Sequence, residues 1–172
     1  MSPGRFARLA AAPLALLALT AGVFRGEGFS INFPDGWSAP TESNGIFTTR
    51  ETGQAGANCN VESRKLATLD GLTQAEINAD YDHVFSLAEW ADFLGLKASE
   101  LTIIAGEVRR LGEHRLQIAT FRVQQPDVDV TVRYAFLVTP GRVVMAGCYA
   151  GTAVFPAYAV IYESAIGSLL PF

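Results

Sequence analysis

The chain has 172 residues, of which 49% are hydrophobic and 17% charged, and its formal net charge is −4 at pH 7. This length is sufficient for one domain with a hydrophobic core, and the composition is not that of a disordered or repetitive protein. The acidic balance argues against nucleic acid or an anionic membrane surface as the main partner.

The N-terminal segment has the pattern of a secretory signal peptide. Arg5 and Arg8 precede an apolar run rich in Leu and Ala, and no acidic residue occurs before Glu27. The small residues at 20–22 provide a cleavage site that leaves Val23 as the new N-terminus. The run is shorter and less hydrophobic than the roughly 20 residues of a membrane-spanning helix. An uncleaved N-terminal anchor is the alternative.

Cleavage after residue 22 defines the expected mature protein. It removes two of the 13 basic residues and none of the 17 acidic ones, so the formal charge becomes −6. We expect residues 23–172 to form a single domain that is periplasmic or secreted, with no stable membrane span after cleavage.

The first elements of the expected domain are short strands. Residues 28–37 alternate apolar and polar side chains up to Pro34, and the following Pro-Asp-Gly is typical of a tight turn. We also expect strands at Ile46–Arg50 and Ala57–Leu66.

Cys59 in the third of these strands and Cys148 are the only two cysteines. Because an exported chain meets oxidising conditions, we expect them to form a disulfide. A redox-active pair and a metal site are the alternatives, although neither cysteine lies in a Cys-x-x-Cys motif.

Between residues 73 and 94 the apolar period becomes helical. Thr73 with Glu76, and Ser86 with Glu89, have the spacing of capping boxes, which predicts two short helices or one broken helix. Gly95 is well placed to end the second.

The remainder predicts four consecutive strands and a terminal helix. The strands are expected at Leu101–Leu111, Arg115–Gln124, Val128–Val138 and Val143–Tyr149, with short turns that favour an antiparallel meander. Residues 154–170 have helical spacing and are expected to cover an apolar sheet face. The fold class is therefore α+β, with a central antiparallel sheet of about six to seven strands flanked by helices.

The order of these elements, with particular residues, resembles the PsbP-like superfamily, which includes DcrB-like and LpqN-like bacterial envelope proteins. The matching residues are Phe29, Phe33, Pro34 and Trp37, then 58–61, 143–150 and 158–168. The resemblance implies a PsbP-like α/β/α sandwich and a non-enzymatic binding or accessory module of the cell envelope. It implies no catalytic residue set and no cofactor. The partner would be an envelope protein or a small ligand.

Arginines recur in the expected meander and form one candidate binding surface. Convergence on the open sheet face would provide a site for an anion or an acidic partner. Pairing with nearby carboxylates across the strands is the alternative. The four candidates are Arg110, Arg115, Arg122 and Arg133.

A second candidate lies in the first expected helix, where Glu76, Asp80 and His83 are spaced to share one face. Carboxylates and an imidazole are ligands for divalent metals. The alternative function is therefore a small secreted hydrolase or metal-binding protein centred on 76–83, and the simpler interpretation is a solvated helix face. No serine lies in a Gly-x-Ser-x-Gly turn, and we assign no catalytic residue.

Overall fold

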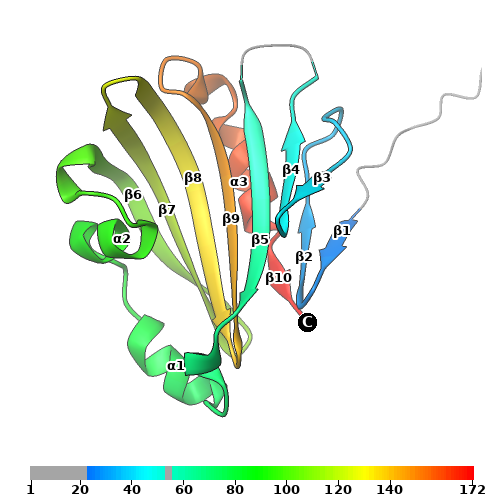
Figure 1. Ribbon diagram of the computed structural model, residues 1–172, viewed down its shortest axis with the longest axis vertical. Coiled ribbons are helices and arrows are strands. Elements are labelled where there is room, and N and C mark those ends of the chain that lie inside the picture. Colours follow the sequence, from blue (N-terminus) through cyan, green and yellow to red (C-terminus); the bar gives the residue numbers. More distant parts are fainter. Residues whose placement is uncertain (1–22, 53–55) are drawn as a thin grey trace, which may run out of the picture.

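A seven-stranded antiparallel sheet forms the centre of the structure, a computed structural model that describes residues 23–52 and 56–172. The expected signal peptide, 1–22, lies outside the described residues. Within the described part the strand order is β3-β4-β5-β9-β8-β7-β6, as the fan of strands in Figure 1 shows. Its members are β3 (Thr41–Ser43), β4 (Ile46–Arg50), β5 (Asn58–Lys65), β6 (Leu101–Leu111), β7 (His114–Gln125), β8 (Val128–Thr139) and β9 (Arg142–Gly151).

The meander expected from the sequence is confirmed. Strands β6, β7, β8 and β9 pair in succession, and each hairpin turn has only two residues between the paired ends. Gly112 and Gly141 have positive φ angles of 60° and 72° in two of these turns, a conformation that glycine adopts without steric cost. The last strand, β9, pairs with β5, which joins the meander to the earlier strands.

Two helices cover one face of the sheet. They are α1 (Gln74–Tyr81) and α2 (Leu87–Leu94), and Figure 1 shows both on the near face. Both expected capping boxes are present, and Gly95 ends α2 in the left-handed conformation. Trp90 of α2 is fully buried against the aromatic side chains of this face.

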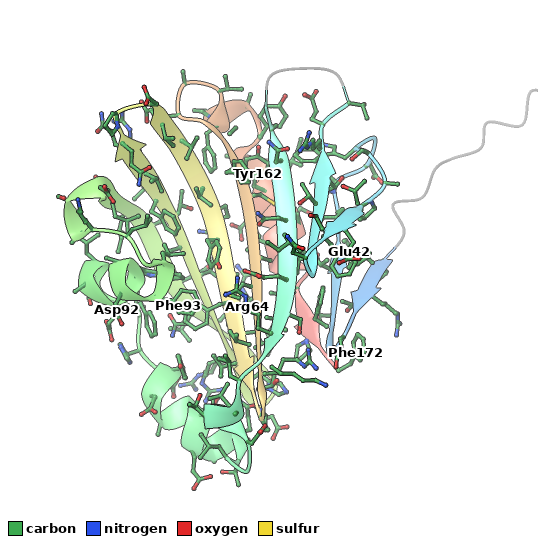
Figure 2. All side chains as sticks on the ribbon, viewed as in Figure 1. Glu42, Arg64, Asp92, Phe93, Tyr162 and Phe172 are labelled. Carbon is green, nitrogen blue, oxygen red and sulfur yellow. A yellow bond between two sulfur atoms is a disulfide. The ribbon has the colours of Figure 1, made fainter. Side chains whose placement is uncertain are left out.

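The opposite face is covered by a small sheet and the third helix. The small sheet has the order β1-β2-β10 within the described residues and consists of β1 (Val23–Gly26), β2 (Phe29–Asn32) and β10 (Leu170–Pro171). The helix is α3 (Ala159–Gly167). Tyr162 of α3 is buried behind the large sheet, and its hydroxyl donates a hydrogen bond to the Tyr149 carbonyl (Figure 2). The result is three layers and two hydrophobic cores, one on each face of the large sheet.

Some elements differ from expectation. The strand expected to stop at Pro34 ends at Asn32, and the C-terminal helix, expected from residue 154, begins at Ala159 after a short 3-10 turn, Phe155–Ala157. Strands β1, β3 and β10 were not expected, because segments of two to four residues are too short for alternation to identify them. Among the described residues, no helix is long and apolar enough to cross a membrane.

Candidate functional site

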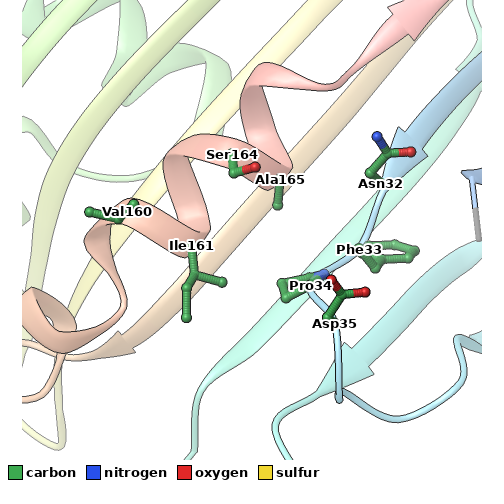
Figure 3. A pocket seen from close by; sticks show the side chains of 8 residues that line it. All are labelled: Asn32, Phe33, Pro34, Asp35, Val160, Ile161, Ser164 and Ala165. Atoms are coloured by element: carbon green, nitrogen blue, oxygen red, sulfur yellow. The ribbon is translucent and has the colours of Figure 1, made fainter. Parts of the chain in front are cut away.

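A groove of about 460 Å³ separates α3 from the segment that follows β2. Figure 3 shows the helix on one side and the turn on the other. Eight residues line the groove: Asn32, Phe33, Pro34, Asp35, Val160, Ile161, Ser164 and Ala165. This volume is within the range of protein ligand sites, roughly 300–1,000 Å³.

Direct contacts fix the two walls relative to each other. The backbone N–H of Asn32 donates to the Ser168 hydroxyl at 2.8 Å, and that hydroxyl donates to the Ala165 carbonyl at 2.6 Å. Beyond the turn, the Trp37 ring packs edge-on against Tyr158 and Tyr162, with centroids 6.4 and 6.1 Å away. These contacts fix the relative positions of the two walls of the groove.

The lining of the groove is mainly apolar, and one carboxylate stands beside it. Ile161 is 38% exposed and Val160 is 83% exposed, although α3 contributes buried side chains to the core on its other side. Asp35 provides the negative charge of the lining, and Ser164 provides a hydroxyl. The apolar part of this lining fits an apolar side chain of a binding partner.

The four candidate arginines do not lie on one face of the sheet. Arg115 and Arg122 lie seven residues apart on β7, so the alternation of side chains places them on opposite faces of the sheet. Arg110 is paired with Arg115 across the strands, and both approach Asp82 at the end of α1, at 3.5 and 2.7 Å. The guanidinium of Arg115 lowers the pKa of the Asp82 carboxyl.

The other two arginines have separate carboxylate partners. Arg122 binds Asp129 through two hydrogen bonds of 2.7 and 2.6 Å, which, together with a hydrogen bond from Thr152, lower the pKa of Asp129 to about 2. Arg133 lies 2.9 Å from Glu107 and pairs with Glu163 of α3. The expectation that the four arginines share one face is therefore wrong, because strand alternation divides them between the two faces of the sheet. Each of the four instead lies close to a carboxylate, as the alternative interpretation expected.

The charged network around Arg133 was only partly anticipated. Arg109, which was not among the four candidates, lies 2.9 Å from Glu107 and 3.0 Å from Glu163. Two arginines and two carboxylates thus tie β6, β8 and α3 together on the face that α3 covers. The contribution of Glu163 had no sequence signal, because it depends on how α3 packs across the sheet.

Two of the candidate metal ligands, Glu76 and His83, bind different partners within the chain. Glu76 accepts hydrogen bonds from the Thr73 backbone and hydroxyl, which lower the pKa of its carboxyl. His83 lies beyond the end of α1 and pairs with Glu89 at 2.7 Å, instead of continuing the face with Asp80. The first expected helix was to include His83, but α1 ends at Tyr81. In residues 23–52 and 56–172, no three His, Cys, Asp or Glu side chains are grouped to hold a metal ion.

The two cysteines form the expected disulfide. Cys59 and Cys148 are fully buried, and the bond crosses from β5 to β9. A disulfide is typical of proteins in oxidising compartments.

Comparison with solved structures extends the description of the fold. A protein from Bacteroides thetaiotaomicron VPI-5482 aligns with a TM-score of 0.50 and 14% identity over 89% of this chain. The chain spans only about half of that protein, 49% of its length. Cyanobacterial PsbP (CyanoP) from Synechocystis sp. PCC 6803 aligns with a TM-score of 0.58 and 12% identity, covering 95% of this chain and 99% of CyanoP.

A third structure has the same architecture. The Pseudomonas aeruginosa protein of unknown function PA94 aligns with a TM-score of 0.53 and 14% identity, covering 88% of this chain and 96% of PA94. No protein-family model matches the chain, and no curated protein sequence matches it. Likeness at 12–14% identity concerns the fold alone. The chain is therefore structurally similar to CyanoP and PA94 and has a PsbP-like α+β fold.

Proposed function

We propose that this protein is an exported accessory module that binds a partner protein of the cell envelope through the groove between α3 and the segment after β2. The observation that carries the proposal is a preformed apolar groove bordered by the exposed Val160 and Ile161. The partner contributes an apolar side chain to the groove.

Some of the residues that match the PsbP-like pattern help to build this groove. Phe33 and Pro34 line it, and Trp37 anchors the turn against α3. A turn held by aromatic contacts presents its surface with little loss of conformational entropy on binding, which favours recognition of a partner. Export is supported by the charge pattern of 1–22 and by the buried disulfide.

Site-specific photo-cross-linking in the intact envelope tests this proposal. A photoreactive amino acid replaces Ile161, which is 38% exposed, and the control position is Val128, which is 39% exposed on the meander. We expect one defined partner to be captured from position 161 and none from position 128. Ser164→Trp, which fills the groove, should abolish that capture without unfolding the protein, because the Ser164 side chain is exposed.

Equal capture from both positions would refute the groove as the binding site. So would capture from position 161 that persists when Ser164→Trp is present. Fractionation of the same cells tests export separately, since a cytoplasmic mature-length protein would contradict that part of the proposal alone.

A further inference from the structure

The two edges of the seven-stranded sheet differ greatly in length. Strand β3 at one edge has three residues, whereas β6 at the other has 11 and pairs with β7 on its inner side. The long edge ends the strand order, so within the described residues no strand pairs with its outer side. A long strand with unpaired backbone groups is a template for pairing with another strand.

Only part of β6 is regular enough to pair. The register with β7 shifts between Ile103 and Ala105, and Ile104 at the irregularity is 61% exposed. From Ala105 to Leu111 the register with β7 is continuous. A bulge disrupts pairing locally, so an added strand would use 105–111.

Symmetry restricts how two copies of this segment can pair. A two-fold axis perpendicular to the sheet makes the strands antiparallel and brings one residue opposite its own copy. An axis at Glu107 would place the two copies of Glu107 directly opposite each other. An axis at Arg109 or Arg110 would do the same with two arginines. Like charges directly opposite each other destabilise a strand pair.

An axis at Val108 gives a complementary arrangement instead. It pairs Val108 with Val108 of the second copy, and it places Glu107 opposite Arg109 twice. It also places Arg110 opposite Gly106, which has no side chain of its own and is covered on that face by Val84. Within one chain Glu107 and Arg109 already pair at 2.9 Å and remain 45% and 33% exposed, so the second copy would add an oppositely charged neighbour to each.

We propose that β6 pairs with β6 of a second copy of this chain across a two-fold axis at Val108, forming one continuous sheet from two protomers. The register over 105–111 leaves no like charges directly opposed. This dimer is independent of the groove beside α3, so failure of either proposal leaves the other standing.

Sedimentation velocity on the exported protein, with its native disulfide intact, measures the association. We expect twice the protomer mass for the wild type. Val108→Arg should restore the protomer mass, because it opposes two positive charges at the axis. Thermal unfolding of the variant verifies that it is folded.

Cysteine cross-linking tests the register. Under mild oxidation Val108→Cys should give a covalent dimer on a non-reducing gel. Arg110→Cys is the control: in this register the two copies of position 110 are four residues apart along the strand, about 13 Å, so no cross-link should form. A wild-type protein that has the protomer mass at its highest attainable concentration would overturn the proposal. Dimers that persist in Val108→Arg, or that cross-link equally at 108 and 110, would overturn it as well.

Discussion

Cys59 and Cys148 stand directly opposite each other on β5 and β9, with their Cα atoms 4.0 Å apart. The disulfide therefore joins two strands that the backbone ladder already pairs, and it closes a loop across 89 positions of sequence. It covalently links the early strands to the end of the meander.

Replacing both cysteines, as Cys59→Ala with Cys148→Ala, should lower the free energy of unfolding by about 2–5 kcal/mol, because the unfolded chain gains entropy when the long loop is opened. Urea unfolding of the variant and the wild type measures the difference. In the purified wild type, intact mass after alkylation without reductant should show no modified thiol. Two modified thiols would contradict the disulfide.

Loss of a capping box should destabilise α2. Ser86→Ala removes the hydroxyl that accepts from the Glu89 amide and donates to the Glu89 carboxylate, and we expect a loss of about 1 kcal/mol in unfolding free energy. The matched control is Ser164→Ala, an exposed serine inside α3, for which a much smaller change is expected. Equal effects of the two substitutions would show that the cap contributes little.

Stability should decrease in acid through two exposed carboxylates. Hydrogen bonds from Ser86 and His83 lower the pKa of Glu89 to about 2, and the pKa of Asp129 is also about 2. Because the folded-state pKa values lie below the unfolded values near 4, this stabilisation is complete above about pH 5 and is lost as the pH falls towards 2. Denaturant unfolding at pH 5 and pH 3 measures the loss. A Glu89→Gln, Asp129→Asn variant should lose less stability over this interval than the wild type does.

The aromatic core beneath α2 depends on Trp90. This ring is fully buried, 5.4 Å from the Phe136 ring and 6.1 Å from the Phe93 ring. Trp90→Ala should cost about 3–5 kcal/mol because it leaves a large cavity. Trp90→Phe should cost less, since it keeps an aromatic ring and removes an indole N–H that has no hydrogen-bond partner. Chemical denaturation followed by Trp37 fluorescence provides the measurement.

The packing of β1 against the core bears on the position of signal cleavage. Phe24 of β1 has its ring 4.8 Å from Phe47 and 5.6 Å from Phe33, so a cut after residue 22 keeps a packed side chain. N-terminal sequencing should find Val23 first in the exported protein. Phe24→Ala should lower the unfolding free energy by about 1–3 kcal/mol. A mature chain that begins beyond Phe24 would contradict both expectations.

The sequence predicted the parts of the fold that local patterns control. Alternating side chains and two-residue turns predict the long strands of the meander. Thr73 and Ser86 predict helix starts, because each capping box depends on contacts within four residues. The disulfide followed from composition and compartment, because only one pairing is possible for two cysteines.

Properties that depend on packing were not predictable in this way. The turn at Pro34 was expected, but its position opposite Ile161 depends on how α3 crosses the sheet. The arginine hypothesis failed because residues that recur along successive strands need not share a face: Arg115 and Arg122 are separated by an odd number of positions. His83 left its expected helix face because α1 ends at Tyr81.

The pairing of β5 with β9 also determines the order in which the chain can mature. Cys59 leaves the ribosome long before Cys148, and the whole meander must follow before β9 is available to it. Until then the first thiol has no intramolecular partner, since the sequence contains only two cysteines. Within one chain this bond can therefore form only after the whole meander as far as Cys148 has been synthesised.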